Sequence, residues 1–200
     1  LDLAAKLTVG GQMPDRLSSM DVGSVILLTA EDGLADTVRP RIDGQGGDSA
    51  LVHAVNCTLD PTQHGRLFSL VDDNIALELL VRELDAKLVI IDPLNAFTGG
   101  TDSHVDAQVR RALTPLTNLA ENTGTAVLVV MHLNQSTLQP TLYRVQGSIG
   151  FVGAARSVLI VVRDKDDPDM RLMVPIKANL SGDMPAVRFT ITDEPALEWH

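Results

Sequence analysis

Residues 87–92 read KLVIID, with four aliphatic side chains between a lysine and an aspartate. Three further runs have the same compact apolar character: SVILLT at 24–29, TAVLVVM at 125–131 and SVLIVV at 157–162. Continuous apolar runs of this length are typical of parallel strands that are covered on both faces. The four runs therefore predict a mostly parallel sheet that is buried between layers of helices.

Helical patterns separate these runs along the chain. Leu1–Leu7, Asn74–Leu84 and Val105–Glu121 carry apolar side chains at helical spacing, and Gly10-Gly11 predicts the end of the first helix. Strands that alternate with helices indicate an α/β fold. In the second helical pattern, Ile75, Leu79 and Leu80 share the expected apolar face, and Leu77 and Leu84 lie near it.

The last part of the chain has strand patterns without helical patterns between them. Arg171–Lys177 and Ala186–Thr192 are rich in β-formers with no helical pattern between them. They predict an antiparallel β-hairpin extension at the edge of the main sheet. With no internal repeat and 200 residues, a single domain over residues 1–200 is the simplest organisation.

Composition narrows the function classes. The net charge of −10 argues against a broad basic surface for nucleic acid. It does not exclude a small basic pore shared between subunits, because the net charge averages over all faces of the protein. The single cysteine, Cys57, cannot form an internal disulfide, which favours a reducing, cytoplasmic location. The apolar runs are strand-sized, so no membrane partner is expected.

Polar side chains that suit nucleotide chemistry follow three of the apolar runs. Glu31, Asp92 and His132 each come just after a predicted strand, where open α/β sheets bind their ligands. Asp92 would hold a water of a Mg²⁺ shell, or it begins the turn before Pro93. Glu31 would polarise an attacking water, or it is an acid at a helix start, the role expected of Asp32.

His132 would sense a γ-phosphate, or it is only a polar strand end. Beyond it, the polar loop 133–146 contains Gln135, Tyr143 and Arg144, which could contact DNA or belong to an ordinary solvated loop. The phosphate loop that such a site needs is missing, because no lysine in the chain stands in a Gly-Lys-Ser/Thr triplet. We therefore expect these 200 residues to hydrolyse ATP poorly or not at all.

Five segments together resemble a known family: SVILLTAEDG, KLVIIDPLNAF, TAVLVVMHLNQS, QGSIGFVGAARSVLIV and VPIKANLSG. In this order they are similar to the RecA-like P-loop ATPases of the RepA hexameric helicase type and their AAA-labelled bacterial and phage relatives. The resemblance covers nearly the whole chain. It implies a RecA-like sheet, ATP and Mg²⁺ as cofactors, a homo-hexamer, and action on single-stranded or double-stranded DNA.

The resemblance also implies roles for individual residues. It assigns Glu31 as the catalytic glutamate, Asp92 as the Mg²⁺-supporting aspartate and His132 as the γ-phosphate sensor. It further implies that Lys177 reaches the nucleotide of a neighbouring subunit, with Arg156 as a second candidate for this role. In that family a phosphate loop precedes a helix like Leu1–Leu7, so we expect the chain to lack the first strand and that loop. The alternative is a degenerate RecA-like module that binds partners without hydrolysis.

Overall fold

A computed structural model describes residues 1–14, 18–55, 66, 68–99, 106–132, 150–179, 185–192 and 196–200. The chain up to the end of β4 is built on a four-stranded sheet in which every pairing is parallel, with the strand order β2-β1-β3-β4. The strands are β1 (Ser24–Thr29), β2 (Val52–Val55), β3 (Ala86–Asp92) and β4 (Ala126–Val129). The predicted α/β fold with a parallel sheet is confirmed. The short strand β2 was not predicted.

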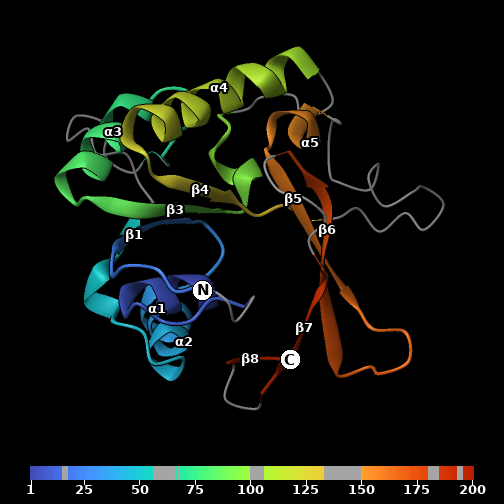
Figure 1. The fold of residues 1–200 in the computed structure, drawn as a ribbon. Helices are drawn as coiled ribbons and strands as arrows, with labels where there is room; N and C mark the ends of the chain where they lie inside the picture. The colour runs from blue at the N-terminus through green and yellow to red at the C-terminus, as the bar shows by residue number, and fades with distance from the viewer. Residues whose placement is uncertain are drawn as a thin grey trace.

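Helices cover both faces of this sheet (Figure 1). On one face, side chains such as Ile26, Val89 and Ile91 pack with residues of α3 (Asn74–Glu83) and α4 (Asp106–Thr123). On the other, their neighbours Val25 and Ile90 pack with α1 and α2. On this second face lie α1 (Asp2–Thr8), α2 (Arg39–Gly44) and the π-helix η1 (Leu34–Val38). The 3₁₀ helices are η2 (Ser49–Leu51), which precedes β2, and η3 (Leu94–Phe97), whose Leu94 and Phe97 pack in the core of the first face.

The first helix ends as the paired glycines predict. Gly10 adopts a φ of +66°, and its N–H donates to the carbonyl of Leu7. The N–H of Gly11 donates to the carbonyl of Lys6 at 2.7 Å. These two bonds form the capping motif that closes a helix with a residue in the left-handed region, which glycine adopts without steric cost.

The buried face of α3 agrees with the expectation only in part. Leu77 and Val81 are its buried side chains, at 1% and 2% exposure, whereas Ile75 is 73% exposed and Leu79 is 64% exposed. Leu80 is partly buried against the core, as expected. The helix is apolar on more than one side, so spacing alone did not fix which side faces the sheet.

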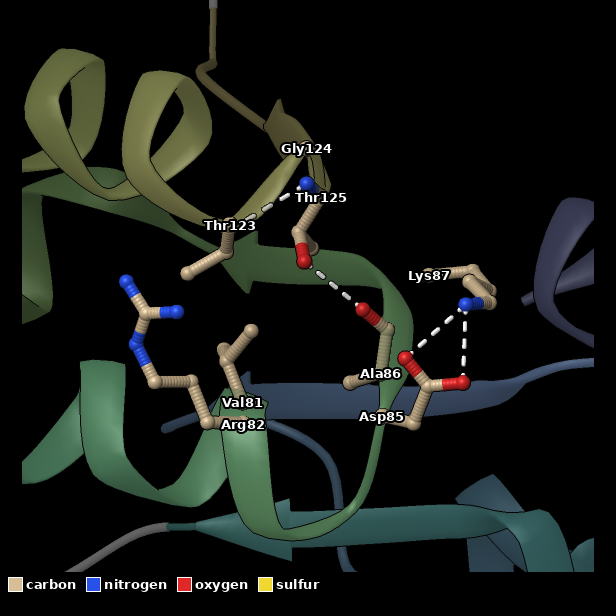
Figure 2. A pocket seen from close by; sticks show the side chains of 8 residues that line it. All are labelled: Val81, Arg82, Asp85, Ala86, Lys87, Thr123, Gly124 and Thr125. Carbon is tan, nitrogen blue, oxygen red and sulfur yellow. Dashed lines mark hydrogen bonds and ion pairs between the residues drawn. The ribbon is translucent and has the colours of Figure 1, made fainter.

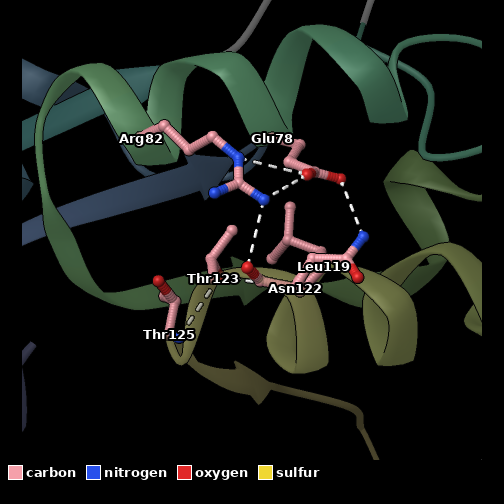
Figure 3. Close-up of polar contacts among 6 residues, drawn as sticks. All are labelled: Glu78, Arg82, Leu119, Asn122, Thr123 and Thr125. Carbon is pink, nitrogen blue, oxygen red and sulfur yellow. Dashed lines mark hydrogen bonds and ion pairs between the residues drawn. The ribbon is translucent and has the colours of Figure 1, made fainter.

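A polar cluster fastens α3 to the end of α4 (Figure 3). Arg82 donates to the Glu78 carboxylate through Nε at 3.2 Å and Nη2 at 2.7 Å. The same Nη2 donates to the carbonyl of Asn122 at 3.0 Å, and the Asn122 amide donates to Glu78 Oε2 at 3.4 Å. The guanidinium thus joins two helices that pack on the same face of the sheet.

The C-terminal part forms a second sheet of four strands in the order β5-β6-β7-β8, with every pairing antiparallel. Its strands are β5 (Ser157–Arg163), β6 (Met170–Ala178), β7 (Val187–Ile191) and β8 (Leu197–Trp199), and the short helix α5 (Gly150–Ala154) precedes them. The predicted hairpin is confirmed as β6–β7, but it lies in this separate sheet, not at the edge of the parallel one.

The expectation that SVLIVV at 157–162 joins the parallel sheet was therefore wrong. This run forms β5, which pairs with β6 in the antiparallel sense across a short turn. The turn from Arg163 to Met170 is too short for the crossover that a parallel pairing of β5 with β6 would need. Among the described residues, no helix is both long and apolar enough to cross a bilayer.

Candidate functional site

The carboxyl ends of the three central strands meet at one edge of the parallel sheet. Thr29 of β1 lies opposite Asp92 of β3, and the N–H of Ala30 donates to the Asp92 carbonyl at 3.3 Å. Beyond the end of β4, the N–H of Val130 donates to the carbonyl of Ile91 at 2.9 Å. These backbone bonds hold the segments that carry Glu31, Asp92 and His132 at the same edge.

The predicted side chains come together there. Oε2 of Glu31 lies 3.6 Å from Nε2 of His132, and these two side chains are 62% and 61% exposed. Both act electrostatically on the carboxyl group of Asp92, as does Asp32. The edge therefore presents an accessible acid and imidazole beside a half-buried carboxylate.

The Asp92 carboxyl group is held in an unfavourable environment for its charge. Burial raises its pKa above the ordinary value, and the negative charges of Asp32 and Glu31 raise it further. The ring of His132 acts in the opposite direction. Three carboxylates at one edge accumulate negative charge that a bound divalent cation would compensate.

Asp32 has a partner that was not predicted. Its carboxylate lies 3.6 Å from Nη1 of Arg41, at the other side of the turn that leads from β1 into η1 and α2. This ion pair fits the local role expected of Asp32 and leaves Glu31 as the acid next to His132. An arginine nine residues downstream gives no sequence signal of this contact, because the pairing depends on how η1 and α2 fold back.

The other predicted site residues are distributed as follows. Lys177 donates to the carbonyls of Val152, Gly153 and Ala155 at 2.9, 3.0 and 2.6 Å, so its ammonium group caps the end of α5. Arg156 lies 3.4 Å from Oε1 of Glu121 and is 63% exposed. The loop candidates Gln135, Tyr143 and Arg144 lie outside the described residues.

A cavity of about 290 Å³ lies at the opposite end of β3, between Val81, Arg82, Asp85–Lys87 and Thr123–Thr125 (Figure 2). Its two cations already have partners. Lys87 Nζ donates to both carboxylate oxygens of Asp85 at 2.9 and 2.8 Å, and Arg82 is bound to Glu78. We therefore locate the candidate site at the carboxyl edge, where the convergent polar groups lie, and not in this cavity.

Within the described residues, no group of three or more histidine, cysteine, aspartate or glutamate side chains is arranged to hold a metal ion by itself. Mg²⁺ commonly takes one or two protein carboxylates and completes its shell with water and substrate phosphates. The half-buried carboxylate of Asp92 beside two further acids fits this mode of binding.

One comparison with known proteins assigns most of the chain to a family. A family model described as an AAA domain matches residues 1–137, which is 137 of the 200 residues. The matched segment includes Glu31, Asp92 and His132, whereas Arg156 and Lys177 lie beyond it. No curated protein matches the chain.

Proposed function

This chain belongs to the AAA domain family, an ATPase-like family, and we propose that it is the ATPase core of a DNA-acting motor of the RepA hexameric helicase type. The observation that carries the proposal is the convergence of Glu31, Asp92 and His132 at the carboxyl edge of the parallel sheet. Ligands of open α/β sheets bind at this edge. The proposed ligand is ATP with Mg²⁺.

Each of the three side chains has a proposed role. Mg²⁺ supplies charge neutralisation for the phosphates when it is bound with the nucleotide. Asp92 would orient a water of the Mg²⁺ shell, a role that suits a half-buried carboxylate beside two further acids. Glu31 positions and polarises the attacking water, and the exposure of its carboxylate leaves room for one.

His132 is proposed to link the acid to the γ-phosphate. Its Nε2 is the atom closest to Glu31, so one ring can contact Glu31 and, by a small change of rotamer, a phosphate oxygen. The contact between Glu31 and His132 is weak, because the two groups are exposed and lie 3.6 Å apart, so a rotamer change of His132 would break it at little cost.

We propose a homo-hexamer in which a cation from a neighbouring subunit completes the site, as an arginine finger does. Arg156 suits this role better than Lys177. The Arg156 side chain is exposed and its pair with Glu121 is long, whereas Lys177 would have to give up three carbonyl acceptors. The DNA substrate, single-stranded or double-stranded, is proposed from the family resemblance.

A non-hydrolysing module is the alternative function. The 200 residues contain no Gly-Lys-Ser/Thr triplet, and the lysine and backbone N–H groups of that loop provide much of the phosphate affinity in P-loop enzymes. A RecA-like module that binds partners without hydrolysing nucleotide would need no such loop.

Isothermal titration with Mg-ATP separates the two functions. We expect weak or no binding by the 200 residues alone, and clear binding when a Gly-Lys-Ser/Thr loop is joined ahead of Leu1. The Glu31→Gln variant of the loop-bearing protein should then bind nucleotide as before and lose at least about a hundredfold in turnover. Failure of the loop-bearing protein to bind would favour the non-hydrolysing module.

A matched control is available in Asp21→Asn, because Asp21 is exposed and lies before β1, at the other edge of the sheet. It removes one negative charge, as Glu31→Gln does, and should leave turnover unchanged. Equal losses in the two variants would show that net charge, not the position of Glu31, controls hydrolysis.

A further inference from the structure

The outer side of α3 carries large apolar side chains that stay exposed. Ile75 and Leu79 lie one turn apart on this helix and are 73% and 64% exposed, and Val71, in the turn before the helix, is 46% exposed. A single exposed aliphatic side chain is ordinary, whereas a group of them indicates an interaction surface. We call this group, with the exposed acids Asp72 and Glu83, the α3 surface.

The charge of the α3 surface is negative. Among the described residues, Glu83 belongs to no ion pair, and Arg82 beside it is bound to Glu78. The Asp72 side chain is 68% exposed, and its carboxylate lies 3.9 Å from Arg66, at the limit of an ion pair. A partner that covers the apolar side chains of this surface is therefore expected to carry basic side chains at its rim.

A second exposed surface lies on one face of the antiparallel sheet. Leu159 and Val161 of β5 are 44% and 54% exposed, and Arg163 lies on the same face because alternate residues of a strand share a face. On β6, Met173 lies opposite Val161, and Arg171 lies opposite Arg163. We call these five residues the sheet surface.

The charge of the sheet surface is positive. Arg163 and Arg171 occupy directly opposite positions of the ladder, where like charges are unfavourable without a counter-charge. Among the described residues, neither arginine belongs to an ion pair. The adjacent acid, Asp164, is paired with Arg188, which lies opposite Leu172 and therefore on the other face. An acidic partner surface would supply the missing counter-charge.

We propose that the α3 surface of one copy of this chain binds the sheet surface of a second copy. Each surface combines exposed aliphatic side chains with charges of one sign, and the two signs are opposite. In Figure 1, α3 and the strands β5 and β6 lie at opposite ends of the molecule, so one chain cannot join its own two surfaces. The contact is therefore head to tail.

A head-to-tail contact leaves one surface of each kind free on every growing assembly. Such contacts build a ring when the rotation between copies closes, and an open chain of copies when it does not. This interface deepens the proposed function, since it would provide contacts within the proposed homo-hexamer. The contact itself requires no nucleotide, because Glu31, Asp92 and His132 belong to neither surface.

Sedimentation velocity of the full 200-residue protein without nucleotide tests the interface. We expect the sedimentation coefficient of the parent to rise with concentration, past that of a dimer. Ile75→Lys and Val161→Asp each introduce a charge of the same sign as the surface they would face. Each variant alone should associate at least about tenfold more weakly, while circular dichroism shows an intact fold because both positions are more than half exposed.

Mixing the two variants gives the decisive result. Ile75→Lys keeps an intact sheet surface and Val161→Asp keeps an intact α3 surface, so the equimolar mixture should form a dimer and stop there. Leu79→Lys and Leu159→Asp repeat the test if either first variant fails to fold. Val22→Lys and Val22→Asp are the matched controls, because Val22 is 57% exposed and belongs to neither surface, and both should associate like the parent.

Three results would overturn the proposal. The parent could stay monomeric at every concentration, which would assign the two surfaces to other partners. Either variant alone could associate as tightly as the parent, which would mean that its intact surface pairs with itself or that another surface is used. The mixture could stay monomeric although both variants are folded. Because no nucleotide is present, none of these results bears on the binding of Mg-ATP, which the titration described above measures separately.

Discussion

Trp199 donates its indole N–H to the carboxylate of Asp2 at 3.0 Å, although 197 positions separate these residues in the chain. Asp2 is only 5% exposed and also lies 3.2 Å from the ammonium group of Lys6. A buried carboxylate requires such partners, because an unpaired charge in this position would be strongly unfavourable. The contact therefore joins β8, the last strand of the antiparallel sheet, to α1, the first helix packed on the parallel sheet.

Replacing Trp199 with phenylalanine tests this connection. The ring contact with Phe189 can persist, but the hydrogen bond to a charged group is lost. We expect the free energy of unfolding to fall by about 1.5–3 kcal/mol, measured by urea denaturation followed by circular dichroism. A double-mutant cycle with Asp2→Ala provides the control, and strictly additive effects would show that the two side chains do not interact.

Two leucines on α3 test which side of the helix faces the core. Leu77 is 1% exposed and Leu79 is 64% exposed, although both are leucines on the same helix. Leu77→Ala should lower the free energy of unfolding by about 2–5 kcal/mol, because it leaves a cavity in the core. Leu79→Ala should change it by less than about 0.5 kcal/mol. If both variants lost a similar free energy of unfolding, Leu79 would also pack against the core, as its helical spacing predicted.

The difference between these leucines shows where spacing fails. Ile75, Leu77, Leu79 and Val81 make α3 apolar on several sides, and the choice between them depends on the sheet and on α4. By contrast, β1, β3 and β4 of the parallel sheet were predictable because continuous apolar runs have few other uses, whereas the short strand β2 has no such run. The run at 157–162 shows the exception, since Leu159 and Val161 in β5 are 44% and 54% exposed despite their apolar character.

The candidate site was predictable for the residues at the strand ends but not for those in the turns. Glu31, Asp92 and His132 could be predicted to meet because the carboxyl ends of parallel strands share an edge, whatever the details of the loops. The pairing of Asp32 with Arg41 depends on a fold-back of η1 and α2, and no sequence pattern encodes it. Contacts that arise from strand order are thus accessible from sequence, whereas contacts made by irregular turns are not.

The Glu78 carboxylate predicts a pH dependence of stability. Hydrogen bonds from Arg82, and after it from Asn122, lower its pKa below the ordinary value. A carboxyl group with a lowered pKa in the folded state stabilises the fold above the pKa it has when unfolded, and this contribution is lost as the pH falls through the folded value. Glu78→Gln should therefore be less stable than the parent at neutral pH, with a difference that shrinks on acidification.

Thermal denaturation of both proteins from neutral to strongly acidic pH measures this difference. Glu83→Gln is the matched control, because Glu83 is exposed on the same helix and belongs to none of the ion pairs around Arg82. The control should give no pH-dependent difference from the parent. A constant offset for Glu78→Gln across the pH range would mean that its effect does not come from the charge.

The ammonium group of Lys177 offers the last prediction, because its position supports two different roles. It donates to three carbonyls at the end of α5, where a cation stabilises a helix through the free carbonyl groups and the helix dipole. Lys177→Met should therefore lower the free energy of unfolding of the chain by about 1–2 kcal/mol. Lys165→Met, at an exposed position in the β5–β6 turn, should have almost no effect. If Lys177 acted only on the nucleotide of a neighbouring subunit, Lys177→Met would leave the stability of the isolated chain unchanged and would lower only the turnover of an assembled, loop-bearing protein.

Urea denaturation of the isolated chain, compared with the turnover of the assembled protein, separates the two roles of Lys177. A loss of stability in Lys177→Met but not in Lys165→Met assigns Lys177 to the cap of its own helix.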